Sequence, residues 1–299
     1  MYTILGATGN IGSKVADILL KKGEKVRVVA RTADRLRQIV GRGAEGMVGD
    51  ALDAEFLTRA FEDADAIFTL IPPNYGADDF IGYADDVGGS IAKAIRAAGT
   101  THVVNLSSVG AELPEGNGLI RGLHRQEDWL NAIEGLNVLH LRPGYFMENL
   151  LWGIELIKRK GINGSAARGD LKFPMIATKD IAREIADRLA KRDFTGSSVK
   201  ELLGERDLTL IEATSIIGKK IGKPDLSYVM FPYDEAENGL RDAGFSPDVS
   251  RLYIEMIRAS NEGRIYGLKG RTAEGTTATS LEDFCDEVFV PSFKVTRAA

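Results

Sequence analysis

Short apolar runs alternate with amphipathic stretches through the first half of the chain. The apolar runs predict β-strands at residues 2–5, 25–30, 46–48, 66–71, 102–106 and 137–141. Apolar residues at helical spacing predict helices near residues 11–22, 34–40, 54–62, 78–98 and 118–134. Strands that alternate with helices in this way are typical of a parallel sheet covered on both faces. We therefore expect an α/β fold with a doubly wound parallel sheet.

The regular alternation stops after Asn149. Beyond it, the pattern predicts helices around residues 150–160, 178–192 and 210–221, and late strands at 199–203 and 226–231. A glycine-rich polar stretch at 161–170 is expected to form a loop, and Thr178 is expected to cap the helix that begins there. We expect a first domain of residues 1–149 and a smaller lobe of residues 150–299, with residues of about 178–203 returning to the first domain.

Three glycines follow the first predicted strand at regular spacing. Gly6, Gly9 and Gly12 lie between a strand and a helix, which is the arrangement that a dinucleotide-binding turn requires. In such a turn the first glycine lets the chain turn sharply, the second lets the backbone approach a pyrophosphate, and the third lets the helix pack closely on the strand. The helix then directs free N–H groups at the phosphates. The predicted phosphate site comprises Gly6, Ala7, Thr8, Gly9, Asn10, Ile11 and Gly12; an ordinary strand–helix turn is the alternative.

Several stretches together resemble one known family. They are residues 6–12, 49–50, 105–108 and 141–149, and they resemble the NmrA-like branch of the atypical short-chain dehydrogenase/reductases. The resemblance is strong over roughly the first half of the chain and weak over the rest. It implies a Rossmann-type sheet that binds NAD(P)(H), with a smaller C-terminal substrate lobe. Members of that family range from NADPH-dependent reductases, including quinone reductases, to redox-sensing regulators without demonstrated chemistry.

The end of the second strand selects the cofactor in dinucleotide-binding folds, because a carboxylate there binds the adenosine ribose and excludes a 2′-phosphate. This chain has Arg31 and Thr32 at that position, and Arg35 follows one helical turn later. A guanidinium group can bind a phosphate through two parallel N–H bonds. We therefore expect NADP(H) to be preferred over NAD(H), with a solvated arginine at the strand end as the alternative for Arg31.

Further cofactor and substrate residues are expected where the other strands end, because ligands of open α/β sheets bind outside the carboxyl ends of the strands. The resemblance places Asp50 and Ala51 near the adenine; the alternative for Asp50 is a cap of the next helix, a role for which Asp53 competes. The remaining candidate cofactor residues are Leu70, Ile71, Pro72, Asn105, Leu106, Ser107, Pro143, Gly144, Tyr145 and Phe146. The candidate substrate residues, which suit a flat apolar molecule or simply fill the core between the lobes, are Tyr145, Phe146, Met147 and Trp152.

The helix after the fifth strand lacks the superfamily's catalytic pair. Ordinary short-chain dehydrogenases carry a Tyr and a Lys four residues apart on this helix, and the Tyr exchanges the substrate proton. Residues 118–130 contain neither, and the resemblance sets His124 at the Lys position and Ile120 at the Tyr position. Ser107 keeps the serine position, although serine is also a common turn residue. The candidate catalytic residues are therefore His124 and Ser107, with a structural histidine as the alternative for His124.

The composition narrows the function classes. The 299 residues carry a formal net charge of −5 and no basic patch, so we expect no direct binding to nucleic acid or to an anionic membrane. No apolar run approaches the roughly 20 residues of a membrane-spanning helix, and the first strand begins at Tyr2, so a cytoplasmic protein is expected. No cluster of His, Cys and carboxylate residues has metal-ligand spacing, so no metal is expected.

Two hypotheses describe the activity. The first is an NADPH-dependent reductase of a small electron-poor molecule such as a quinone. A reduced quinone is a phenolate-like oxygen, whose conjugate acid has a pKa of about 10, so water can protonate it without a Tyr–Lys pair. The second is a redox sensor that binds NADP(H) and signals to a protein partner without turnover, which the missing Tyr and Lys also favour. We rank the reductase first.

Overall fold

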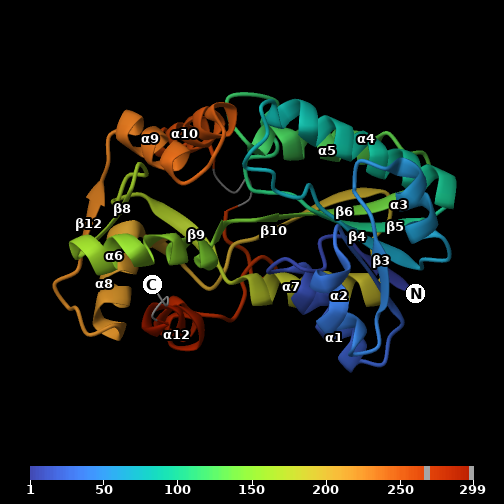
Figure 1. The fold of residues 1–299 in the computed structure, drawn as a ribbon, viewed down its shortest axis with the longest axis horizontal. Coiled ribbons are helices and arrows are strands. Elements are labelled where there is room, and N and C mark those ends of the chain that lie inside the picture. The colour runs from blue at the N-terminus through green and yellow to red at the C-terminus, as the bar shows by residue number, and fades with distance from the viewer. Residues whose placement is uncertain (266–269, 296–299) are drawn as a thin grey trace.

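The computed structural model describes residues 1–265 and 270–295, and its centre is a parallel β-sheet (Figure 1). Within these residues, seven strands form the sheet in the order β10-β6-β5-β4-β1-β2-β3. Their bounds are β1 Tyr2–Ile4, β2 Val26–Ala30, β3 Glu45–Val48, β4 Ala66–Thr69, β5 His102–Leu106, β6 Asn137–Pro143 and β10 Ser197–Leu202. Helices cover both faces, so the predicted doubly wound, Rossmann-type α/β fold is confirmed.

Two helical layers enclose the sheet. One face carries α1 Gly12–Lys21, α2 Ala33–Val40 and α7 Thr178–Lys191, and the other carries α3 Ala54–Phe61, α4 Phe80–Ala98 and α5 Ile120–Asn131 (Figure 1). Leu19 of α1 and Ile185 of α7 belong to the same buried cluster as Phe68. Ile91 of α4 belongs to a second buried cluster with Ile67. Because Ile67 and Phe68 are neighbours on β4, the strand contributes alternate side chains to the two cores.

The C-terminal part is built on smaller sheets. Within the described residues, one sheet comprises β7 Tyr145–Phe146, β9 Lys172–Ile176 and β11 Asp207–Thr209, and another pairs β8 Ile162–Ser165 with β12 Ser227–Met230. The helical elements are the 3₁₀ helix η1 Met147–Gly153, α6 Ile154–Lys160, α8 Leu210–Lys220, α9 Tyr233–Asp242, α10 Pro247–Asn261, α11 Leu281–Phe284, the π-helix η2 Cys285–Phe289 and α12 Val290–Lys294. Leu150, Met175, Ile217 and Phe284 belong to the buried core of this part. In the part of the chain that the structure describes, no helix is long and apolar enough to cross a membrane.

Some expectations for the second half were wrong. The stretch 161–170 is not only a loop, because β8 lies within it and pairs in parallel with the distant β12. The helix expected at 150–160 begins earlier, as η1 at Met147. Thr178 does not cap α7, because Ala177 is the cap residue and Thr178 is the first residue of the helix. Sequence reasoning also missed α9, which buries none of its own residues, and α10.

The segment after β9 lies against the central sheet. Helix α7 packs beside α1, and β10 pairs in parallel with β6 at the sheet edge. Ile181 of α7 and Leu202 of β10 belong to the same buried cluster as Ile4 of β1. The domain boundaries expected from the sequence, at residue 149 and around 178–203, stay predictions.

Candidate functional site

The strand order marks the place where the chain reverses direction across the sheet. From β1 the chain adds β2 and β3 on one side, and then crosses to add β4, β5 and β6 on the other. Ligands of doubly wound sheets bind outside the carboxyl ends of the strands at this reversal. The loop of residues 5–11 follows β1, and the loop of residues 70–79 follows β4. These loops therefore form the base of the candidate cofactor site.

Each glycine of the first loop has a distinct geometric reason. Gly6 has a φ of +62°, a conformation that residues with a side chain rarely adopt. A Cβ on Gly12 would lie 2.3 Å from the carbonyl oxygen of Gly6, so α1 packs on the loop only because residue 12 has no side chain. Among the described atoms, a Cβ on Gly9 would meet only the same oxygen, at 3.3 Å. The space beside Gly9 is therefore open, which fits a pyrophosphate that passes against the backbone.

The N-terminus of α1 adjoins this loop and favours an anion. In the described residues, no side chain caps this helix and its first turn holds no acidic residue. The Lys14 ammonium lies 2.6 Å from the carbonyl oxygen of Asn10 and 3.2 Å from the hydroxyl oxygen of Thr178. Burial lowers the pKa of Lys14, and the Glu148 carboxylate opposes that shift. The helix dipole and the lysine together place positive charge beside the loop.

Glu148 links this cation to the C-terminal part of the chain. Its carboxylate accepts hydrogen bonds from the backbone N–H of Thr178, at 3.1 Å, and from the Thr178 hydroxyl. The carboxylate therefore satisfies the first turn of α7, which takes no side-chain bond from its own cap residue. Because Glu148 belongs to η1 and Lys14 to α1, these contacts hold η1 against the glycine loop.

Basic side chains gather where the second strand ends. A surface hollow of about 510 Å³ between α1 and α2 is lined by Thr8, Ser13, Lys14, Asp17, Arg35, Gln38, Ile39 and Arg42. Arg31 follows directly after β2, and its side chain is exposed, as is that of Arg35. Within the described residues, neither guanidinium forms an ion pair, whereas Arg42 is paired with Asp17 at 3.0 Å. Arg31 and Arg35 are therefore available to bind a phosphate ester.

The two aspartates after β3 have different roles. The Asp53 carboxylate caps α3, because it accepts hydrogen bonds from the N–H groups of Glu55 and Phe56 at 3.0 Å each. The Asp50 carboxylate accepts only a local bond among those described, from the N–H of Leu52 at 3.0 Å. The alternative assignment of Asp50 as the helix cap is therefore wrong. Asp50 follows the end of β3, and its role near the adenine stays a prediction.

Tyr83 of α4 interacts with groups that follow the second, third and fourth strands. Its hydroxyl donates to the carbonyl oxygen of Pro72 at 3.0 Å. Burial raises the pKa of Tyr83, Asp50 raises it further, and Arg31 lowers it. The Tyr83 phenol is therefore bonded to the loop after β4 and lies within electrostatic range of Asp50 and Arg31.

Two glycines allow close packing of the segments that follow the fourth and sixth strands. Leu70 packs against Gly6, where a Cβ would lie 2.9 Å from a leucine methyl carbon. Gly144 allows β9 to pass closely, because a Cβ there would lie 2.4 Å from the carbonyl oxygen of Pro174. Glycine thus lets Leu70 pack on the loop after β1 and lets the segment after β6 pass close to β9.

The predicted substrate residues differ in exposure. Met147 is only 1% exposed and belongs to the C-terminal core. Tyr145 and Phe146 are half-buried, and burial raises the pKa of the Tyr145 phenol far above its ordinary value. Trp152 is 53% exposed. Trp152 therefore offers the most accessible ring of this set.

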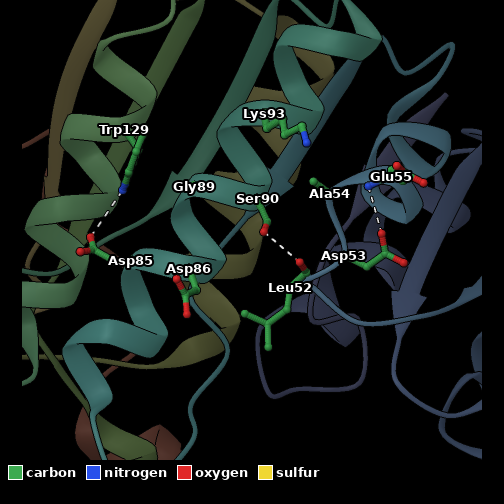
Figure 2. Close-up of a pocket in the computed structure, with 10 residues that line it drawn as sticks. All are labelled: Leu52, Asp53, Ala54, Glu55, Asp85, Asp86, Gly89, Ser90, Lys93 and Trp129. Atoms are coloured by element: carbon green, nitrogen blue, oxygen red, sulfur yellow. Dashed lines mark hydrogen bonds between the residues drawn. The ribbon is translucent and has the colours of Figure 1, made fainter.

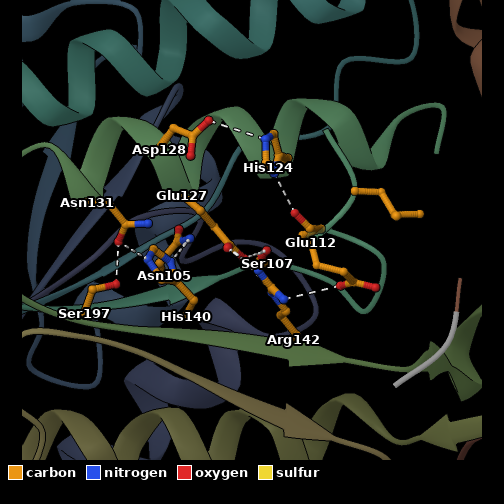
Figure 3. A network of polar contacts seen from close by, with 12 residues as sticks. Asn105, Ser107, Glu112, His124, Glu127, Asp128, Asn131, His140, Arg142 and Ser197 are labelled. Atoms are coloured by element: carbon orange, nitrogen blue, oxygen red, sulfur yellow. Dashed lines mark hydrogen bonds and ion pairs between the residues drawn. The ribbon is translucent and has the colours of Figure 1, made fainter. Parts of the chain in front are cut away.

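A buried ionic network lies between α5 and the ends of β5 and β6 (Figure 3). The Ser107 hydroxyl donates to the Glu127 carboxylate. Arg142 binds both oxygens of Glu127, with N···O distances of 2.9 and 2.6 Å, and lies 3.3 Å from Glu112. Ser107 and Glu127 are 3% and 4% exposed. The Ser107 proton is thus engaged by a carboxylate, and this network joins α5 to two strands.

A second buried network crosses the sheet next to the first. Thr69 donates to the Asn105 side-chain oxygen at 3.1 Å, and the Asn105 amide nitrogen lies 3.0 Å from Nδ1 of His140. The Nε2 atom of His140 lies 2.9 Å from the side-chain oxygen of Asn131. Since Nδ1 accepts and Nε2 donates, these partners fit a neutral imidazole. Burial lowers the pKa of His140 to about 4.

His124 is held on both ring nitrogens (Figure 3). Its Nδ1 atom lies 2.7 Å from the carbonyl oxygen of Ala111, and Nε2 lies 3.4 Å from the Asp128 carboxylate. Nδ1 therefore donates to the carbonyl, and Nε2 is directed at an acceptor on the same helix. These contacts fit the structural alternative for His124, while a catalytic role stays a prediction.

A second hollow has the opposite charge. Figure 2 shows it between the start of α3 and the middle of α4, with Trp129 of α5 at its edge. It has a volume of about 670 Å³ and is lined by Leu52, Asp53, Ala54, Glu55, Asp85, Asp86, Gly89, Ser90, Lys93 and Trp129. Its carboxylates outnumber its one lysine and disfavour phosphate groups. Within the described residues, no group of three His, Cys, Asp or Glu side chains could hold a metal ion.

The structure brings the predicted cofactor residues to one edge of the sheet. Residues 6–12, 31–35, 50–51, 70–72, 105–107 and 143–146 all lie at or after the carboxyl ends of parallel strands. Sequence reasoning missed Lys14, Glu148 and Tyr83. Lys14 lies two residues beyond the glycine motif, and Glu148 lies inside the stretch 141–149, so both are close to motifs of the sequence analysis. Their contact with Thr178 is tertiary and has no local sequence signal.

Known proteins resemble this chain over most of its length. A family model described as NAD(P)H-binding matches residues 6–192. A (4-alkanoyl-5-oxo-2,5-dihydrofuran-3-yl)methyl phosphate reductase from Streptomyces griseus is 27% identical over 263 residues, which cover 88% of this chain and 88% of that protein. An NmrA-like family domain-containing oxidoreductase from Aspergillus japonicus is 30% identical over 163 residues, which cover 50% of this chain and 48% of that protein.

A solved structure with the same fold contains NADPH. The NADPH-dependent quinone oxidoreductase from Escherichia coli, in complex with NADPH, matches with a TM-score of 0.81 at 22% identity, over 97% of this chain and 100% of that one. The family match begins at Gly6, the first glycine of the loop, and spans more than half of the chain. The chain therefore belongs to the NAD(P)H-binding family, resembles NmrA-like oxidoreductases over half of its length, and is an NAD(P)H-dependent oxidoreductase.

Proposed function

We propose that this oxidoreductase prefers NADPH to NADH and reduces a small electron-poor acceptor, with a quinone as the leading class. The observation that carries the proposal is the composition of α5, which contains neither Tyr nor Lys. Hydride transfer to a simple ketone forms a strongly basic alkoxide and needs a proton donor. The oxygen of a reduced quinone resembles a phenolate, with a conjugate-acid pKa of about 10, and water can protonate it.

The polar groups near the ends of β5 and β6 support the same substrate class. The Ser107 hydroxyl donates to Glu127, whose carboxylate is paired with Arg142. His124 is held by the Ala111 carbonyl and lies near Asp128. Because these groups have protein partners, the acceptor that suits the site best is one whose reduction requires no acid from the enzyme.

The exposed guanidinium groups of Arg31 and Arg35 support the preference for NADPH. They stand where an NAD-specific site would carry a carboxylate, and they suit the 2′-phosphate together with Thr8 and Thr32. Bound NADPH would supply a hydride, and a quinone would take that hydride and one proton from water to become a hydroquinone, leaving NADP⁺.

The remaining predicted residues take positions along the cofactor in this proposal. The open backbone at Gly9, the N-terminus of α1 and Lys14 would hold the pyrophosphate. Asp50 and Ala51 would border the adenosine. The nicotinamide side would comprise Leu70, Ile71, Pro72, Asn105, Leu106, Ser107, Pro143 and Gly144, and the acceptor side Tyr145, Phe146, Met147 and Trp152.

The names of similar proteins support the proposal. The neighbour from Escherichia coli is an NADPH-dependent quinone oxidoreductase, and the relative from Streptomyces griseus is a reductase. Both names fit hydride transfer to a small molecule.

Steady-state oxidation of NADPH with a panel of acceptors tests the proposal. We expect turnover with at least one quinone, no turnover with cyclohexanone, and a lower KM for NADPH than for NADH. Gly9→Val serves as the cofactor-free control. Turnover with the ketone but not with quinones would overturn the substrate class. NADPH binding without turnover of any acceptor would overturn the proposed reduction and favour the redox-sensor hypothesis.

A further inference from the structure

An aromatic cluster lies beyond the loop that follows β4. Within the described residues it comprises Tyr75 of that loop, Trp152 of η1, Phe245 just before α10 and Tyr253 of α10, and we name it the aromatic corner. Tyr75 stacks on Phe245 with centroids 4.5 Å apart and planes 25° apart. Trp152 stacks on Tyr253 at 6.1 Å and 29°. Each outer ring is therefore backed by an inner ring.

The two outer rings meet at a right angle and remain open to solvent. Tyr75 and Trp152 have centroids 6.4 Å apart and planes at 86°. Tyr75 is 40% exposed and Trp152 is 53% exposed, whereas the inner rings are half-buried. Large exposed aromatic rings that are held in a fixed orientation are typical of ligand-binding surfaces.

Backbone contacts fix this orientation. The N–H of Ser246 donates to the carbonyl oxygen of Tyr75 at 2.8 Å, and the Ser246 hydroxyl donates to the carbonyl oxygen of Ala77 at 2.5 Å. The Asp248 carboxylate accepts a bond from the N–H of Phe80 at 2.9 Å. The start of α10 is thus tied to the loop after β4, which holds the Tyr75 and Phe245 segments together.

Both outer rings belong to segments that begin at the cofactor site. Tyr75 lies five residues beyond Leu70, whose side chain packs on Gly6. Trp152 lies four residues beyond Glu148, which bonds Thr178 next to Lys14. A 3₁₀ helix rises about 2 Å per residue, so Trp152 is displaced by roughly 8 Å along η1 from that contact. The aromatic corner is therefore joined to the candidate cofactor site through two chain segments, the loop after β4 and η1.

We propose that the aromatic corner binds the acceptor and selects fused-ring quinones over single-ring quinones. This inference rests on the proposed quinone reduction. The electron-rich faces of indole and phenol stack favourably on an electron-poor ring system. A fused system is wide enough to stack on Trp152 while its edge meets Tyr75, whereas a single ring contacts one of them at a time and buries less apolar area.

Kinetics with phenanthrenequinone and para-benzoquinone test the selection. In Trp152→Leu and in Tyr75→Leu, the KM for phenanthrenequinone should rise roughly tenfold, the upper range for loss of one aromatic stack. The KM for para-benzoquinone should rise by a smaller factor, because a single ring contacts only one of the two side chains at a time and buries less apolar area. Trp129→Leu is the matched control, because it removes a second half-exposed indole, 39% exposed, at the acidic hollow on α5.

The outcomes that contradict the inference are equally specific. An equal rise of KM for both quinones, or no rise for phenanthrenequinone, would overturn it. A change of oligomeric state in Trp152→Leu without a change of KM would show instead that the corner contacts a second copy of the chain. If a leucine variant fails to fold, Trp152→Phe and Tyr75→Phe decide, because a retained ring should retain the selection.

Fluorescence provides a reading that does not depend on turnover. The chain contains two tryptophans, Trp129 and Trp152. With NADP⁺ bound, phenanthrenequinone should quench the indole emission of Trp129→Phe, which retains Trp152, and not that of Trp152→Phe. Quenching in neither variant would overturn the aromatic corner as a binding site. If no quinone is turned over but this quenching is found, the proposed reduction fails while the binding site stands.

Discussion

The two ends of the candidate cofactor site are built in different ways. The phosphate end is local in sequence, because the glycine loop, the start of α1, Arg31 and Arg35 all lie within the first 35 residues. The proposed acceptor end is assembled from the loop after β4, η1 and α10, so Tyr75, Trp152 and Tyr253 come from distant segments. The geometry of the phosphate end therefore depends on local backbone conformation, whereas that of the proposed acceptor end depends on tertiary packing between distant segments.

Gly9→Val should have the largest effect at the phosphate end. Its side chain would fill the open space beside the backbone, so NADPH binding should fall below detection. The chain should still fold, because a Cβ there meets only the Gly6 oxygen among the described atoms, at 3.3 Å. Isothermal titration and circular dichroism measure the two effects. Retained NADPH affinity in a folded variant would remove this loop from the site.

Glu127→Ala should show how strongly the fold depends on the buried network between α5 and the ends of β5 and β6. The substitution removes the carboxylate that binds the buried Arg142 guanidinium through two hydrogen bonds and leaves only the longer Glu112 contact among those described, so the free energy of unfolding should fall by about 3 kcal/mol. Arg35→Ala is the matched control at the phosphate end, since Arg35 is exposed and should leave stability unchanged. Urea unfolding measures the free energy of unfolding of both variants. An equal loss in Glu127→Ala and Arg35→Ala would contradict the prediction.

Acid should destabilise the network that joins β5 to β6. The ordinary pKa of a histidine is 6.5, and burial in the fold lowers the pKa of His140 to about 4. As the pH falls from about 6.5 to 4, the unfolded chain binds a proton at this residue that the folded chain does not, so the free energy of unfolding falls by roughly 3 kcal/mol. His140→Gln should lose less stability over this range in urea unfolding. If the free energy of unfolding has the same pH dependence in His140→Gln and in the unmutated protein, His140 is not the source of the acid destabilisation.

His124→Phe should have the smallest effect. Since Nδ1 is held by Ala111 and water can protonate a reduced quinone, kcat with quinones should fall by less than about tenfold. Stopped-flow and steady-state kinetics measure the loss, with NADPH affinity as the control. A fall of about 10²-fold or more, with unchanged NADPH affinity, would identify His124 as a general acid.

The same contrast explains what the sequence could predict. The roles expected of Gly6 and Gly12 agree with a positive φ and a close approach of α1, because both depend on neighbours a few residues away. The cap assigned to Thr178 was wrong because the partner that satisfies the helix, Glu148, is distant in sequence. Strand β8 was missed for the same reason: its short, partly polar sequence does not predict a strand, and its pairing partner β12 is distant in sequence.

The residues on the proposed substrate side show most clearly which contacts the sequence could not predict. Trp152 lies near a motif and was expected to contact substrate, but nothing local indicates that Tyr75, Phe245 and Tyr253 gather around it. The serine position was recognisable, whereas its hydrogen bond to Glu127 depends on the packing of α5 over β5. Periodicity predicts elements, and short motifs predict local turns, but contacts between distant elements need the structure.

A crossed measurement tests most directly whether the two ends act separately. The KM values for NADPH and for phenanthrenequinone are measured in Arg31→Asp and in Trp152→Leu. Arg31→Asp should raise the KM for NADPH roughly 10- to 100-fold, as expected for loss of a charge-assisted hydrogen bond, and leave that for the quinone unchanged. Trp152→Leu should raise the KM for phenanthrenequinone and leave the KM for NADPH unchanged. Unchanged discrimination between NADPH and NADH in Arg31→Asp, or a joint rise of both KM values in either variant, would contradict the division of the site into a phosphate end and an acceptor end.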